Sequence, residues 1–201
     1  MKALIRFAFL LLLAPATQAQ VVIDETRLPE PWIEIVADIT GDGAPEILRA
    51  MPFSDEYDVI SIETGQAYGV GDPILLPIWA NRTGDPGIEL TSPTSFLIRT
   101  GCFACGRTHS FIEHKIAFRD GRYVVAGYTE VYIDRLFATA ITCDVNYLTR
   151  RSEIKVDDTL VKKGSARERY PLAQWVNGSP PACDAAEEYK SDSFLETWLA
   201  E

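Results

Sequence analysis

The sequence is poor in basic residues. It contains 19 Lys and Arg against 29 Asp and Glu, which gives a formal net charge of −10 at pH 7. Proteins that bind nucleic acids depend on Lys and Arg side chains that neutralise phosphates and release counterions. This deficit argues against a nucleic-acid partner. It suits a chain that stays dissolved and attracts cations.

Long apolar runs are also missing beyond the first residues, and the later sequence has no segment long enough to span a bilayer. We therefore expect no membrane span in the mature chain. The N-terminus has a different pattern. Lys2 and Arg6 are followed by an apolar stretch over residues 7–14, and Thr17 and Ala19 offer small side chains for cleavage.

This N-terminal pattern predicts a signal peptide over residues 1–19 and a single β-rich domain over residues 20–201. No Cys stands at the cleavage point, so a lipid-anchored protein is not indicated. The alternative is an uncleaved membrane anchor. A cleaved signal peptide implies a periplasmic or secreted protein.

Signatures of common enzymes are absent from the sequence. It has no Gly-x-Ser-x-Gly, no His-Glu-x-x-His and no glycine-rich phosphate loop, and it has only two His residues. These absences favour a binding or structural domain over an enzyme. Its partner, a protein or a small molecule, is not identified by any motif. A periplasmic inhibitor or immunity-type protein is an alternative, because such proteins combine a signal peptide with a small acidic domain.

The most informative segment is an acidic loop, Asp38-Ile39-Thr40-Gly41-Asp42-Gly43-Ala44-Pro45-Glu46. Ca²⁺ prefers six to eight oxygen ligands, and alternating acidic positions in a tight turn supply them. The ligand set predicted here comprises the side chains of Asp38, Thr40, Asp42 and Glu46 with the carbonyl of Ala44. An EF-hand is excluded because Arg49 occupies its twelfth position. The alternative is a metal-free turn held by bonds from side chains to the backbone.

The four cysteines are Cys102, Cys105, Cys143 and Cys183. An even number in an exported chain predicts disulfides, and we favour Cys143–Cys183 with a local Cys102–Cys105 bridge. Two alternatives use the same segment. Cys102 and Cys105 can form a redox-active pair. With His109 they can also bind zinc, if Cys143 or Cys183 completes the four ligands.

Short segments rich in β-branched residues predict strands at Val59–Glu63, Ile74–Trp79 and Phe96–Arg99. The strongest element is a hairpin of residues 109–119 and 122–133 around Asp120-Gly121. A third strand follows over residues 139–148, and residues 183–199 form a short helical tail. The predicted fold is mainly β, an antiparallel β-meander or sandwich with a short helical C-terminal tail.

A two-residue turn also predicts the register of this hairpin. On one apolar face it pairs Phe118 with Tyr123, Ile116 with Val125, His114 with Gly127 and Ile112 with Thr129. The opposite face is predicted to meet solvent and carries Glu113, Lys115, Arg119, Arg122 and Glu130. His114 is therefore expected to be a core residue and not a catalyst.

The acidic loop resembles the calcium loop of FG-GAP or VCBS-type repeats, although Thr40 and Glu46 depart from that pattern. Over residues 87–149 the chain also resembles a group of uncharacterised secreted proteins of Gram-negative bacteria. The matching segments are residues 116–128 and 143–149. The resemblance implies an exported β-rich protein and assigns no catalytic residue. Arg150 stands where that group has Gly, so the turn after this strand is expected to differ.

Overall fold

The computed structural model describes residues 30–52, 57–63, 74–79, 87–102, 106–174 and 179–200. The predicted signal peptide, residues 1–19, lies outside these ranges. Within the described part of the chain, no helix combines the length and apolar character needed to cross a membrane.

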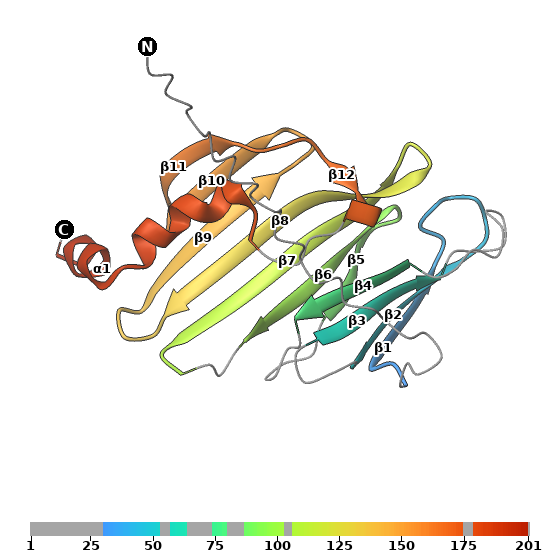
Figure 1. The fold of residues 1–201 in the computed structure, drawn as a ribbon, viewed down its shortest axis with the longest axis horizontal. Coiled ribbons are helices and arrows are strands. Elements are labelled where there is room, and N and C mark those ends of the chain that lie inside the picture. Colours follow the sequence, from blue (N-terminus) through green and yellow to red (C-terminus); the bar gives the residue numbers. More distant parts are fainter. Residues whose placement is uncertain are drawn as a thin grey trace, which may run out of the picture.

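The described residues form two antiparallel sheets (Figure 1). The small sheet contains, in this order, β1 (Ile33–Ala37), β2 (Glu46–Pro52), β3 (Tyr57–Glu63) and β4 (Ile74–Trp79). The large sheet follows chain order through β5 (Gly87–Ser92), β6 (Ser95–Cys102), β7 (Thr108–Arg119), β8 (Arg122–Asp134), β9 (Thr139–Asn146), β10 (Arg151–Val156) and β11 (Thr159–Ser165). A short strand, β12 (Tyr170–Pro171), pairs with β8. Because consecutive strands are neighbours, the predicted antiparallel meander is confirmed.

Among the described residues, the helical segments come late in the chain. They are η3 (Leu172–Gln174), η4 (Pro181–Lys190) and α1 (Asp192–Trp198), of which η3 and η4 are 3₁₀ helices. The predicted short helical tail is therefore confirmed. In Figure 1, η4 crosses the face of the large sheet, where it packs against β9 and β10.

One hydrophobic core joins both sheets to this helical cover. It contains residues from each part, among them Leu48, Ile60, Phe96, Ile116, Ile154, Ala186 and Leu195. The sequence of β9 explains how a strand contributes to it. Ile141, Cys143 and Val145 alternate with polar residues, and each of the three is almost completely buried. Alternation places all three on one face, which we call the inner face of the large sheet.

The β7–β8 hairpin contains a β-bulge. Next to the turn, Ile116 pairs with Val125, as the sequence predicts. One step further, Lys115 pairs with Gly127, so Ala126 is an extra residue on β8. A bulge of this kind moves the following residues of its strand to the opposite faces.

Two predicted pairs beyond the bulge are therefore wrong. His114 lies opposite Tyr128 and not Gly127, and Ile112 lies opposite Glu130 and not Thr129. The same shift overturns the prediction that Glu130 meets solvent with the outer charged residues. Glu130 lies on the inner face together with Tyr128, and its side chain is 15% exposed.

The turn between β9 and β10 contains a strained residue. Arg150 has a φ of +57°, in the left-handed region that costs a residue with a Cβ about 1–2 kcal/mol. The turn therefore has the geometry that favours Gly, although the chain has Arg there. The Asn146 side chain supports the turn, because its Oδ1 accepts bonds from the N–H groups of Leu148 and Thr149, each at 3.0 Å.

Replacing Arg150 with Gly is expected to raise the free energy of unfolding by about 1 kcal/mol, because the strain disappears. The exposed ion pair between Arg150 and Glu168 that is lost contributes little. Urea unfolding of both proteins measures the difference. The control is Arg151→Gly, which places Gly at the first residue of β10, paired with strands on both sides, and is expected to destabilise. A loss of stability in Arg150→Gly would contradict this account of the turn.

Candidate functional site

The acidic loop connects β1 to β2 and folds around the carboxylate of Asp38. This carboxylate accepts bonds from the N–H groups of Gly41 at 2.7 Å, Asp42 at 3.1 Å and Gly43 at 2.9 Å. Both glycines have positive φ, +77° and +87°, which explains why residues without a Cβ stand there. The loop is thus a tight turn whose N–H groups converge on one anionic side chain.

Glu46 closes the loop from the opposite end. It is the first residue of β2 and is completely buried. Its Oε2 accepts bonds from the N–H groups of Ile39 at 2.6 Å and Thr40 at 3.2 Å, and its Oε1 accepts one from the Thr40 hydroxyl at 3.0 Å. Asp42 binds within the loop, where its Oδ1 accepts a hydrogen bond from the N–H group of Ala44 at 2.7 Å. The five predicted ligand residues share this short loop, and its carboxylates are bonded to the loop's own N–H groups.

Three carboxylates gather here without a cationic side chain. Within the described residues, no Lys or Arg forms an ion pair with Asp38, Asp42 or Glu46. The basic residue nearest in sequence, Arg49, instead binds Glu34 at 2.8 Å and also pairs with Glu63. The loop thus carries a concentrated negative charge that only backbone N–H groups and one hydroxyl offset.

Tyr123 of β8 adds a buried hydroxyl near this charge. Its side chain is 5% exposed, and within the described part of the chain the hydroxyl has no hydrogen-bond partner. Burial raises the pKa of Tyr123, and the carboxylates of Glu46, Asp42 and Asp38 raise it further. Sequence reasoning assigned Tyr123 to the apolar face, which its burial confirms, and offered no sign of an unpartnered hydroxyl there.

The carboxylates as they lie do not form a finished metal site. Among the described residues, no group of three or more His, Cys, Asp or Glu side chains has a metal-binding arrangement. In the loop, the carboxylates point toward N–H groups. An ionised carboxylate has about four lone-pair positions, so the bonds to Asp38 and Glu46 leave each of them further acceptor capacity.

The cysteines are paired. Cys143 of β9 and Cys183 of η4 form a disulfide with a Cα–Cα distance of 5.7 Å, as the sequence predicts. Cys102 is also disulfide-bonded, and Cys105 lies outside the described residues. Because Cys143 and Cys183 are joined, neither supplies the fourth ligand of the alternative zinc site. His109 is buried on β7.

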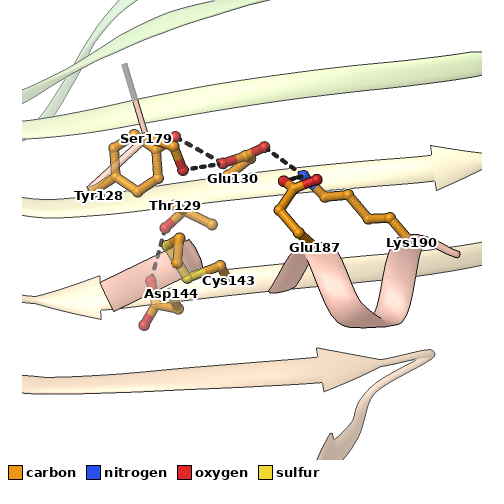
Figure 2. Close-up of a disulfide and its surroundings, with 9 residues drawn as sticks. Tyr128, Thr129, Glu130, Cys143, Asp144, Ser179, Glu187 and Lys190 are labelled. Atoms are coloured by element: carbon orange, nitrogen blue, oxygen red, sulfur yellow. Dashed lines mark hydrogen bonds and ion pairs between the residues drawn. A yellow bond between two sulfur atoms is a disulfide. The ribbon is translucent and has the colours of Figure 1, made fainter. Parts of the chain in front are cut away.

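A polar cluster lies beside this disulfide (Figure 2). Glu130 accepts bonds from the Tyr128 hydroxyl at 2.9 Å and the Ser179 hydroxyl at 2.6 Å, and Lys190 of η4 binds it at 3.1 Å. Lys190 also binds Glu187 at 2.7 Å. The disulfide and the Glu130–Lys190 pair together fasten η4 to the inner face of the large sheet. The predicted hairpin register missed this cluster, because the bulge moves Glu130 inward and its one local signal, Gly127 inside the strand, was not used.

The ionisation of the cluster follows from these contacts. Burial by itself would raise the pKa of Glu130, but the bonds from Ser179, Lys190 and Tyr128 outweigh it and lower that pKa. Burial likewise opposes the charge of Lys190, and the two acidic partners outweigh it and raise its pKa. Glu130 and Lys190 are thus both charged near neutral pH. With every oxygen of Glu130 bonded, the arrangement is suited to holding η4 in place and not to proton transfer.

Comparison with known proteins finds no matching family model, no similar curated protein and no similar solved structure. The fold class of this protein is therefore described from its structure alone. It is a mainly antiparallel β protein with two sheets, one described disulfide and a short helical cover.

Proposed function

We propose that this protein is an exported β-rich domain of binding or structural type, in which the loop of residues 38–46 holds a structural Ca²⁺ ion. The observation that carries the proposal is the accumulation of three carboxylates in one loop without a cationic side chain among the described residues. A divalent cation would neutralise most of that charge.

The loop contains the kinds of oxygen that Ca²⁺ prefers. Asp38, Asp42 and Glu46 supply carboxylates, Thr40 supplies a hydroxyl, and Ala44 supplies a carbonyl. Small shifts of these side chains away from their N–H partners would turn free lone pairs toward a common centre. A site that needs such a rearrangement is expected to bind weakly, with a Kd in the extracellular range of about 10⁻⁴–10⁻³ M.

Export is supported by two independent features. The N-terminal sequence has the pattern of a signal peptide, and disulfides such as Cys143–Cys183 persist in oxidising compartments. The resemblance to secreted Gram-negative proteins with one FG-GAP-like loop agrees with the same compartment. We therefore place the mature protein in the periplasm or outside the cell, where millimolar Ca²⁺ would fill a weak site.

Calcium is expected to stabilise the mature protein measurably. At a concentration ten to a hundred times the Kd, a ligand of the folded state adds about 1.4–2.7 kcal/mol to the free energy of unfolding. Urea unfolding with Ca²⁺ and with Mg²⁺ at equal ionic strength measures this gain. Mg²⁺ serves as the control because it demands a stricter octahedral geometry.

Two variants with the same change of charge make the test specific. Asp38→Asn is expected to lose the gain from Ca²⁺, because it removes the carboxylate around which the loop folds. Asp144→Asn, on an exposed side chain that binds Thr129, is expected to keep it. An equal gain in all three proteins would mean that Ca²⁺ acts elsewhere, and no gain in the wild-type protein would refute the proposal.

A further inference from the structure

Basic residues of this acidic chain gather at one edge of the large sheet. Residues 148–169, which include β10, β11 and most of the segment before β12, carry seven basic and four acidic side chains, a net charge of +3. We call the seven basic residues the basic edge: Arg150, Arg151, Lys155, Lys162, Lys163, Arg167 and Arg169. By contrast, the described residues between positions 30 and 63 carry seven acidic side chains and one basic side chain. Charge is therefore strongly segregated in this protein.

The two charged regions lie on opposite sides of the molecule. β11 is the last strand of the large sheet, whereas the small sheet contacts that sheet at β5, the strand at the other end of its order. In Figure 1, β10 and β11 lie at the upper left and the small sheet lies at the lower right. Charges further apart than about 10 Å are largely screened at about 0.1 M salt. The net negative charge of the chain therefore does not prevent an anionic partner from binding the basic edge.

Most of the basic edge is not neutralised by the protein itself. Arg150 and Arg169 each pair with one exposed carboxylate, and the guanidinium of Arg167 stacks over the Tyr170 ring at 3.7 Å. Within the described part of the chain, the four remaining members form no ion pair: Arg151, Lys155, Lys162 and Lys163. Lysines on an edge strand such as β11 also discourage unwanted strand pairing, but that role does not explain the arginines outside it.

Arg150 supplies an observation that is independent of the charge distribution. Its left-handed φ of +57° strains the backbone, and its exposed ion pair with Glu168 contributes little to stability. Because Gly would relieve the strain, the fold itself gains little from an arginine at this position. Strained residues are typical of functional sites. A contact with a partner outside the protein accounts for this side chain better than the fold does.

Two exposed leucines lie among these cations. Leu148, in the turn that also contains Arg150, is 48% exposed, and Leu160, opposite Lys155 on β11, is 40% exposed. At a bilayer surface, basic side chains bind lipid phosphates while neighbouring apolar side chains enter the headgroup region. We propose that the basic edge binds the surface of a membrane that contains anionic phospholipids. This peripheral contact is a further property of the protein and does not depend on the calcium loop.

Co-sedimentation with lipid vesicles tests this inference. The mature protein is expected to bind vesicles of phosphatidylglycerol mixed with phosphatidylcholine, and not vesicles of phosphatidylcholine alone. EDTA is present throughout, so that Ca²⁺ cannot bridge acidic residues to the headgroups. The double variant Lys162→Gln/Lys163→Gln is expected to bind the anionic vesicles about twentyfold more weakly, because each basic residue near such a surface contributes a factor of about five.

The matched control is Lys115→Gln/Arg135→Gln, which makes the same change of net charge outside the basic edge and is expected to bind like the wild-type protein. All four substituted side chains are exposed. No binding to the anionic vesicles, equal binding to both kinds of vesicle, or an equal loss in both double variants would overturn the inference. Stronger binding to soluble polyglutamate than to the vesicles would also overturn it, in favour of an acidic protein partner. None of these outcomes affects the calcium loop, which is titrated separately.

Discussion

Replacing both Cys143 and Cys183 with Ala is expected to lower the free energy of unfolding by about 4 kcal/mol. The disulfide joins residues 40 positions apart, and closing a loop of this size removes about that much chain entropy from the unfolded state. Both cysteines are 2% exposed, so the substitutions also remove packing within the core. Urea unfolding of the wild-type protein and the double variant measures the difference.

The matched control replaces Cys102 and Cys105 with Ala. The bridge predicted between these residues, three positions apart in the sequence, would close only a short loop, so the expected loss of stability is smaller. A loss in the Cys143/Cys183 variant no larger than that of the control would contradict the view that the disulfide fastens η4 to the sheet. The Glu130–Lys190 pair would then be the dominant attachment.

Mild acid, below about pH 6.5, is expected to destabilise the protein, because His114 is buried in neutral form. Burial lowers the pKa of His114 from 6.5 to about 3, and its ring packs edge-to-face against Tyr128 at a centroid distance of 5.1 Å. The unfolded chain takes up the proton near the ordinary pKa. Between these two pKa values the unfolded state binds more protons, so stability present above pH 6.5 is lost as the pH falls toward about 3.

The size of the effect follows from linkage. One such group changes the free energy of unfolding by up to about 1.4 kcal/mol per pH unit, so about 2 kcal/mol is lost between pH 6.5 and about pH 5. Unfolding curves at several pH values measure the slope. In His114→Phe, which keeps an aromatic ring beside Tyr128, the loss of stability between pH 6.5 and about pH 5 is expected to be smaller by about 2 kcal/mol, and the slope correspondingly shallower. Equal slopes in the two proteins would show that His114 is not buried in neutral form.

Much of this fold could be predicted from local signals. The Asp120-Gly121 turn identified the central hairpin, and alternation placed Ile141, Cys143 and Val145 on one face. The even number of cysteines predicted disulfides but allowed three connectivities, and the favoured Cys143–Cys183 pairing, which joins the tail to the sheet, is confirmed. Each of these features depends on residues that are close in sequence or on a covalent rule.

Features that depend on backbone irregularity escaped prediction. The bulge at Ala126 reverses the faces of Tyr128 and Glu130, and its only local signal is the neighbouring Gly127, which does not fix where the extra residue falls. The β10–β11 hairpin was missed because its turn uses Asp157 and Asp158, both with positive φ, where Asn-Gly is the usual signal. In addition, the polar, exposed edge strand β11 offers no apolar alternation.

The acidic loop shows a different limit of sequence reasoning. The residues that favour a calcium site also favour a tight turn, since Asp38 and Glu46 can bind either a cation or backbone N–H groups. The pattern alone does not separate these outcomes.

Calorimetric titration of the mature wild-type protein with Ca²⁺ tests the central claim most directly. The account predicts one site with a Kd of about 10⁻⁴–10⁻³ M, and it predicts that Asp38→Asn removes the heat of binding. The absence of any heat of binding, together with an unchanged melting temperature at millimolar Ca²⁺, would contradict it. The loop of residues 38–46 would then be a metal-free turn that Asp38 and Glu46 hold through backbone N–H groups and the Thr40 hydroxyl.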